Sequence, residues 1–444
     1  MQTHPSEEVL EDFILSQDRG RLAVLWHLIG CTSCRSKFLF LPRPERPPLE
    51  GEVRFGVPDY DRVLAEVGPV VRSFERALKE ERAAAPGLYV ELTEPPAEQR
   101  AVRVANPRFH TWGVAELLVE RSLEVSDSAY GEELGLLALR LVEHLDASRY
   151  GAERIEDLRA QAWAHIGNAC RLRSDLQGAE DAFGHAFSHL EKGTQDALEQ
   201  AVLLDLEASL RRDQRRFEDA FKLLRRAVEI FLDYGERHRA GRSLVSMSIV
   251  HSQSGNPAEG IPLLQQALEM LDPELEPRLL LCARHNLAVY FADVGRFWEA
   301  QAAYRAARPL YRSFPDAWTQ NRRKWIKGRI SRGLGQLRQA ESLFLASREG
   351  FLAEGIPYDT ALVSLEIALL YAEQGRTAEL KQLAVEMVPI FSSRHIHREA
   401  LAALSFLQQV LAGEALATEV VARVADYLKR AQHDPELRFQ GAEA

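Results

Sequence analysis

Four glycines divide the second half of the sequence at a constant interval. Gly255, Gly295, Gly335 and Gly375 each lie forty residues from the next. A fixed period of this length is typical of architectures built from stacked supersecondary units, in which each unit covers the apolar face of its neighbour. Each glycine follows a stretch with helical periodicity. We therefore expect it to end the first helix of a unit in the left-handed conformation that favours glycine.

Composition and charge narrow the class of protein. Of the 444 residues, 46% are hydrophobic and 27% are charged, which is typical of a folded globular chain rather than a disordered one. Alanine, leucine, glutamate and arginine dominate, which favours helix. The net charge of -10 argues against broad nucleic-acid binding, although it leaves a local basic patch open.

Targeting and redox signals are weak. The first residues lack the basic region and apolar core of a signal peptide, and no apolar stretch is long enough to cross a bilayer. Four cysteines in so long a chain do not form a disulfide framework. We expect a cytoplasmic protein with no membrane contact.

The residues around the glycines repeat as well. One copy of the pattern contains Trp163, Ile166, Gly167, Cys170, Ala179, Phe183 and Ala186. Its small–large–small part returns as Ala220, Leu224 and Ala227, then Gly260, Leu264 and Ala267, then Ala300, Tyr304 and Ala307, then Ala340, Phe344 and Ser347. Small residues let two helices approach closely, and the large ones fill the layer between neighbouring pairs.

This frame resembles the tetratricopeptide (TPR) family in a form of about forty residues, over residues 160–390. The resemblance implies an all-α fold: a right-handed superhelical solenoid of helical pairs. With degenerate pairs or caps at 107–150 and 396–432, we place the solenoid at 107–432 and a tail at 433–444. The alternative is a helical bundle whose periodicity is accidental, which a near-constant shift over successive copies makes the poorer interpretation.

The amino-terminal segment carries a separate set of metal-ligand side chains. His27, Cys31 and Cys34 form an H-x3-C-x2-C motif, with His4 upstream. A structural zinc ion takes four nitrogen or sulfur ligands, so three residues of the motif and His4 would complete a Zn²⁺ site. A redox Cys-x2-Cys pair would need a βαβ context, and the periodicity here is helical.

Residues 1–40 resemble the zinc-binding, zinc-finger-like domain of anti-sigma proteins. The resemblance implies zinc ligation by His27, Cys31 and Cys34, with His4 where that family commonly has cysteine. It also implies contact with an extracytoplasmic-function sigma factor or another transcription component. No transmembrane segment accompanies the motif, so membrane signalling does not follow from the resemblance.

A proline-rich linker with one amphipathic helix is expected over residues 41–106. Its apolar stripe contains Val63, Val67, Val70, Val71, Phe74 and Leu78. Such a helix needs a cover, which is either the first repeat, as we favour, or a second copy of the chain in a homodimer. Residues 85–107, with four prolines, are expected to form a loop.

The first helix of each TPR pair usually lines the concave groove, and one of these helices is rich in arginine. Arg322, Trp325, Arg329 and Arg332 share a face by their spacing. Together they could bind a carboxylate or an acidic peptide. The alternative is a salt-bridged helix with its tryptophan in the packing layer. Arg242, Asn168 and Asn286 are the other residues expected to contact a partner.

These observations predict a non-enzymatic scaffold or regulator. Its TPR groove would bind a protein or peptide, and its zinc module would contact a sigma factor or another transcription component. One alternative is an enzyme that uses the amino-terminal zinc or thiols. It is disfavoured because the sequence contains no P-loop, dinucleotide fingerprint or nucleophile elbow. A purely structural adaptor is the other alternative.

Overall fold

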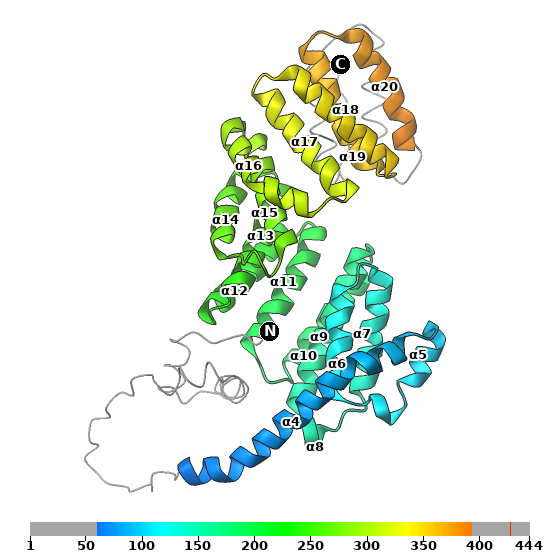
Figure 1. The fold of residues 1–444 in the computed structure, drawn as a ribbon, viewed down its shortest axis with the longest axis vertical. Coiled ribbons are helices and arrows are strands. Elements are labelled where there is room, and N and C mark those ends of the chain that lie inside the picture. Colours follow the sequence, from blue (N-terminus) through cyan, green and yellow to red (C-terminus); the bar gives the residue numbers. More distant parts are fainter. Residues whose placement is uncertain (1–59, 393–426, 428–444) are drawn as a thin grey trace, which may run out of the picture. The chain divides into compact units, whose positions relative to one another are not determined.

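The computed structural model describes residues 60–392 and Tyr427 (Figure 1). The described residues divide into two compact units between Ala240 and Gly241. The predicted zinc ligands His4, His27, Cys31 and Cys34 lie outside these residues. So do the 1–40 domain, the tail and, apart from Tyr427, the 396–432 cap. All regular structure over 60–392 is helical. Within the described residues, no helix has the length and apolarity that a membrane span requires.

The first unit begins with a long helix and continues as helical pairs. Its helices are α4 (Tyr60–Thr93), α5 (Ala97–Arg103), η1 (Pro107–Phe109), α6 (Trp112–Glu124), α7 (Ser128–Val142), α8 (Ala147–Tyr150), α9 (Ala152–Leu172), α10 (Leu176–Leu190), α11 (Ala197–Asp213) and α12 (Phe217–Asp233). The boundary between the units falls within α13 (Arg237–Gln253).

The second unit continues the same alternation with a regular period. After α13 it contains α14 (Pro257–Met270), α15 (Pro277–Asp293), α16 (Phe297–Ser313), α17 (Ala317–Gly333), α18 (Leu337–Ala353), α19 (Pro357–Glu373) and α20 (Thr377–Ser392). Helices α15, α17 and α19 each pack on the second helix of their own pair, and they also pack on one another in sequence. The described chain is thus a tandem helical repeat of the TPR solenoid type.

The four glycines that lie forty residues apart end the first helices of their repeats, as predicted. Gly255, Gly295, Gly335 and Gly375 have φ angles of 87°, 77°, 75° and 67°. The next N–H in each turn reaches back five residues, as when Asn256 N–H donates to the carbonyl of His251 at 2.8 Å. This bond is typical of a left-handed helix cap. Ser174 and Arg215 hold the same place in earlier repeats, with φ angles of 65° and 61°, although neither is glycine.

The small positions of the repeat are close helix contacts. Ala179, Ala220, Ala300 and Ala340 are fully buried. A Cβ atom added at Gly328 would lie 2.6 Å from Cε1 of Phe344, so this position has no room for a side chain. The packing prediction made from the repeat frame is therefore confirmed for these residues.

The loop expected over residues 85–107 is wrong. Helix α4 continues through Pro86 to Thr93, and α5 follows it. A proline inside a helix removes a hydrogen bond and costs about 3 kcal/mol, but Ala85 and Leu92 are almost fully buried in the core of the first pair. The burial of this apolar face outweighs the proline.

Helix α4 packs on the first repeat, which is the alternative that we favoured for its apolar stripe. Leu78 is buried in that core, and Phe74 packs against it. A carboxylate fixes the contact, because Glu81 Oε2 accepts hydrogen bonds from the backbone N–H of Trp112 and from the hydroxyl of Tyr150, both at 3.0 Å.

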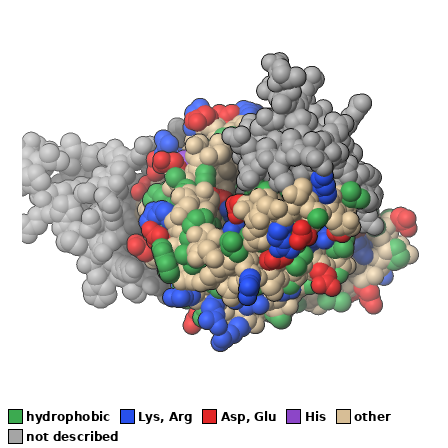
Figure 2. Space-filling view, turned by 90° about the horizontal axis from the view of Figure 1, so that it is seen from above, with side chains coloured by type: hydrophobic (Ala, Val, Ile, Leu, Met, Phe, Trp, Pro, Cys, Tyr) green, Lys and Arg blue, Asp and Glu red, His purple; other side chains and the backbone are tan. Residues whose placement is uncertain are grey.

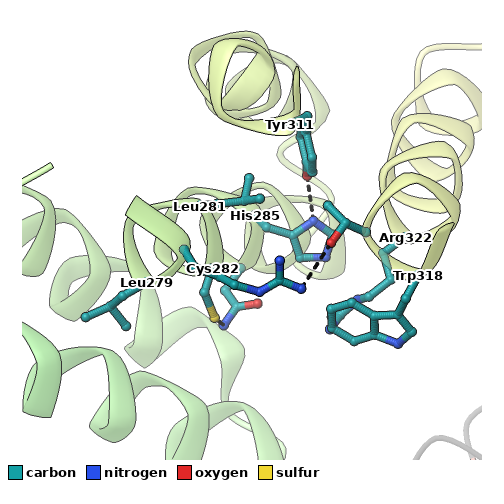
Figure 3. Close-up of a pocket in the computed structure, with 10 residues that line it drawn as sticks. Leu279, Leu281, Cys282, His285, Tyr311, Trp318 and Arg322 are labelled. Carbon is teal, nitrogen blue, oxygen red and sulfur yellow. Dashed lines mark hydrogen bonds between the residues drawn. The ribbon is translucent and has the colours of Figure 1, made fainter. Parts of the chain in front are cut away.

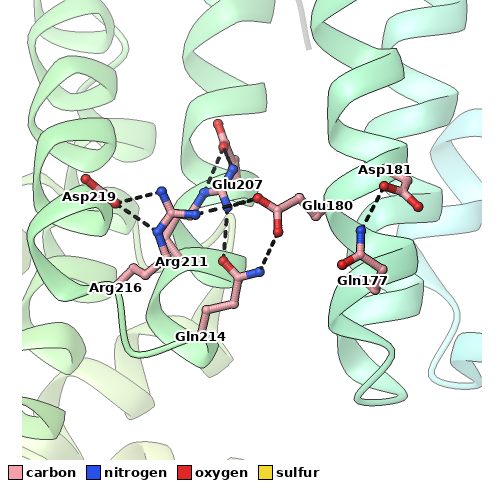
Figure 4. A network of polar contacts seen from close by, with 8 residues as sticks. All are labelled: Gln177, Glu180, Asp181, Glu207, Arg211, Gln214, Arg216 and Asp219. Carbon is pink, nitrogen blue, oxygen red and sulfur yellow. Dashed lines mark hydrogen bonds and ion pairs between the residues drawn. The ribbon is translucent and has the colours of Figure 1, made fainter.

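Ion pairs connect neighbouring repeats of the first unit (Figure 4). Arg211 of α11 contacts Glu180 of α10 and Glu207 of its own helix, both at 2.6 Å. Gln214 donates to the second oxygen of Glu180 at 3.0 Å. Arg216 pairs with Asp219 at 2.9 Å. The arginines at this helix end are therefore matched by acids and do not form a free basic patch.

Candidate partner-binding site

Helix α17 of the second unit holds the predicted arginines, and it begins in a defined way. Asp316 caps its first turn by accepting from the backbone N–H of Thr319 at 2.9 Å. The helix lies next to the first helices of the flanking repeats, α15 and α19. Its side chains can therefore reach acids on either neighbour.

Arg329 and Arg332 are bound to acids of the adjacent repeats. Arg329 contacts Asp293 of α15 at 2.6 Å and Glu366 of α19 at 3.2 Å. Arg332 contacts the other oxygen of Glu366 at 3.1 Å and also pairs with Glu373. Only 5% of the Glu366 side chain is exposed, so these five charges form an internal ladder across three repeats. For the carboxyl-terminal half of α17, the structure therefore agrees with the alternative of a salt-bridged helix.

Trp325 lies in the packing layer. Its ring meets that of Phe351 of α18 edge-on, with centroids 6.2 Å apart. Its indole Nε1 is buried and has no hydrogen-bond partner among the described residues. The spacing predicted Trp325 on the same helix face as the arginines, whereas its ring contacts Phe351 on the second helix of its own pair.

A cavity of about 300 Å³ opens between α15 and the first turns of α17 (Figure 3). Its lining includes Arg278, Leu279, Leu281, Cys282, His285, Asn286, Tyr311, Trp318, Thr319 and Arg322. Most of that surface is apolar, and a few polar groups face into it. This combination is typical of a ligand site, and the volume is at the lower end of the usual range.

Arg322 lies at the cavity beside an aromatic ring. Its guanidinium stands over the ring of Trp318, 4.8 Å from the centroid. Within the described residues it forms no ion pair or hydrogen bond. Arg278, the second arginine of the lining, pairs with Asp316 at 3.2 Å and stands over Phe314.

The inner wall of the cavity is neutral. His285 Nδ1 and the hydroxyl of Tyr311 share a hydrogen bond of 2.6 Å. Burial, with Arg322 and Arg329 nearby, holds the pKa of His285 well below its usual range, so the ring is uncharged at pH 7. Burial also raises the pKa of the Cys282 thiol. Asn286 donates a long hydrogen bond to that sulfur, at 3.6 Å.

Two of the seven predicted partner residues line the cavity. Arg322 and Asn286 meet at the cavity, whereas Trp325, Arg329 and Arg332 are engaged elsewhere on α17. Arg242 is not part of the cavity lining and pairs with Glu276 at 2.8 Å, and Asn168 belongs to the first unit, where it accepts from Arg171 at 2.9 Å. The structure therefore narrows the candidate site to the start of α17.

Sequence reasoning missed Trp318, Arg278 and Tyr311. Trp318 stands one helical turn before Arg322, a spacing that permits stacking, and that signal was available. Tyr311 belongs to the second helix of the preceding pair, and its approach to His285 depends on the packing of whole helices. No cluster of three or more histidine, cysteine or acidic side chains suited to a metal ion occurs within the described residues.

Charges of both signs are interspersed on the face shown in Figure 2, where no extended basic stripe is visible among the coloured residues. The fold and the cavity define this molecule as a helical-repeat protein with a ligand-sized hollow on its first helices. Residues 199–272 and 243–313 match the family model of the tetratricopeptide repeat. The chain therefore carries tetratricopeptide repeats.

Solved structures with similar folds are distant in sequence. A Rap protein complexed with competence and sporulation factor is 14% identical, with a TM-score of 0.53 over 76% of this chain and 88% of that chain. The apo form of the quorum sensor NprR from B. thuringiensis is 13% identical, with a TM-score of 0.46 over 76% and 99%. None of the curated proteins matches this sequence. The likeness to the Rap protein concerns the fold alone.

Proposed function

We propose that this chain is a non-enzymatic interaction scaffold that binds a protein or peptide partner at the cavity between α15 and α17. The observation that carries the proposal is the cavity itself, which lies on the first helices of adjacent repeats. Its largely apolar wall can bury a partner side chain, and its polar groups can orient one. Repeats of this type use such surfaces to hold extended partners.

The chemistry of the lining favours binding over catalysis. Among the described residues, the lining contains no aspartate or glutamate that could act as a general acid or base. His285 is engaged with Tyr311, and the raised pKa of Cys282 reduces its thiolate fraction. A partner site needs none of these activated groups.

The test is a selection of random peptides displayed against the full chain, followed by binding measurements on two variants. Cys282→Phe fills the cavity, whereas Leu345→Phe places the same aromatic side chain on α18, away from the cavity lining, where Leu345 is 42% exposed. We expect the selected peptides to bind wild type and Leu345→Phe equally and Cys282→Phe at least tenfold more weakly. Equal binding to all three proteins would place the site elsewhere.

We also propose that His27, Cys31, Cys34 and His4 hold one Zn²⁺ ion. The donor set supports this, because a histidine and two thiolates at H-x3-C-x2-C spacing suit tetrahedral zinc. Metal analysis of the full chain should give about one zinc per chain. Cys31→Ser should lose it, while Cys282→Ser should keep it. Zinc-free wild-type protein would contradict this proposal.

Contact between the zinc module and a sigma factor is a further proposal that rests on the amino-terminal resemblance. It is supported by the H-x3-C-x2-C motif alone. We expect a purified extracytoplasmic-function sigma factor to bind the full chain and to be released by a zinc chelator. Binding that is absent, or that persists in Cys31→Ser, would count against it.

A further inference from the structure

The two arginines of the cavity lining differ in whether they form an ion pair. Arg278 is neutralised by Asp316, whereas Arg322 has no ion pair or hydrogen bond within the described residues. An arginine carries five N–H donors in a planar fork. Leaving them without partners beside an apolar wall is unfavourable unless water or a ligand accepts them.

Trp318 limits the directions from which a ligand can reach the guanidinium of Arg322. The stacked ring, 4.8 Å from the guanidinium carbon, covers one face of the group and leaves the edge with the N–H donors to meet a ligand. Burial raises the pKa of Asp359 of α19 above its ordinary value, and the nearby charge of Arg322 partly opposes that rise. Asp359 makes no ion pair with Arg322.

The charge of the lining suits a ligand with a single negative charge. Arg278 is paired with an acid and His285 is neutral, so among the described lining residues Arg322 is the one cation without an ion pair. A phosphate dianion would call for a second free cation. A carboxylate matches one arginine in both charge and planar geometry.

The remainder of the cavity suits an apolar group beside that carboxylate. Leu279, Leu281 and the exposed part of Trp318 provide apolar surface in the same cavity as Arg322. Asn286 offers an amide on the same wall, which can pair with a peptide backbone. A ligand would therefore combine an anion, a backbone and a large apolar side chain, all of which a peptide contains.

We propose that the cavity recognises a peptide carboxylate through Arg322, with an adjacent large apolar side chain seated against the apolar part of the lining. This inference rests on the proposed function, since it names the partner chemistry of the same site. The carboxylate comes from an acidic side chain or from the end of the peptide, and both present the same planar anion to the guanidinium.

The experiment uses the full chain and three synthetic pools of heptapeptides rich in leucine and phenylalanine. The first has a fixed glutamate and an amidated end, the second has glutamine in its place with the same amidated end, and the third has glutamine and a free carboxyl end. Binding is followed by fluorescence anisotropy. In parallel, alkylation of Cys282 is followed by mass spectrometry, because a peptide seated in the cavity should shield that thiol.

We expect at least one carboxylate pool to bind at least tenfold more tightly than the amidated glutamine pool and to slow alkylation of Cys282. The pool that does so identifies the source of the carboxylate. Arg322→Gln should remove the preference. Arg338→Gln makes the same charge change at an exposed position of α18 and should leave the preference intact.

Four results would overturn the inference in different ways. If all three pools bind wild type equally and shield Cys282, the proposed function stands and the carboxylate recognition is wrong. If no pool binds or shields Cys282, both are wrong. If 3-phenylpropanoate protects Cys282 from alkylation and binds as tightly as the best pool, the site is one for a small carboxylic acid. The proposal of a peptide ligand would then be wrong. A carboxylate preference that survives in Arg322→Gln would also refute the role of Arg322.

Discussion

Gly335 offers a direct test of the repeat register, because its φ angle of 75° is left-handed and a Cβ atom there would meet nothing within 4 Å. Replacing it with alanine therefore changes backbone strain without creating a clash. The left-handed conformation costs an alanine about 1–2 kcal/mol. Alanine also lowers the conformational entropy of the unfolded chain, which offsets about 0.4–1 kcal/mol of this cost. We expect Gly335→Ala to destabilise the protein by about 1 kcal/mol.

The matched control is Gly184→Ala on α10. A Cβ atom at Gly184 also meets nothing within 4 Å, but its backbone is helical. Alanine there should stabilise the protein by about 0.5–1 kcal/mol. Urea titrations followed by circular dichroism would give both values, with unchanged slopes as the check on comparability. If the two substitutions shift the urea midpoint in the same direction, the left-handed conformation assigned to Gly335 is refuted.

Three further predictions concern buried charge. Glu366→Gln should destabilise the second unit by about 2 kcal/mol in urea titration, because it leaves two arginines short of a partner; Glu373→Gln, at a 38% exposed side chain, should cost under about 1 kcal/mol. Burial, with Asp196 nearby, raises the pKa of Glu199 to about 7, so the folded state binds more protons than the unfolded state between pH 4.5 and 7. Glu199→Gln should therefore stabilise the protein at pH 8 but not at pH 4, whereas exposed Glu191→Gln should change neither value. Burial lowers the pKa of His165 to about 4, so its contribution to stability, present above about pH 6.5, should fall as pH drops toward 4; His165→Gln should flatten that part of the thermal-melt profile.

The repeat architecture was predictable because short-range spacing determines it. The glycine turns, the buried alanines and the large residue between them each follow from helix geometry, so the close contact of Gly328 with Phe344 follows from the repeat frame. Helix α4 was harder to predict, since Pro86 is a local signal whereas the burial of Leu92 depends on residues that follow it in sequence.

The site was only partly predictable. Arg322 and Asn286 were identified from the repeat frame. The ion pairs of Arg329 with acids 36 and 37 residues away were not predicted. Those separations are close to one repeat, so an acid nearly one period from an arginine is a usable signal of pairing between neighbouring repeats. The orientation of Trp325 toward Phe351 depends on side-chain packing that spacing alone does not describe.

The ladder formed by Asp293, Arg329, Glu366, Arg332 and Glu373 has a consequence for recognition. It holds α17 against both neighbours at its carboxyl end, while Arg322 and Trp318 lie near its amino end. A partner would then meet a helix whose position is set before encounter. Less conformational entropy would be lost on association, and affinity would rise without any added contact.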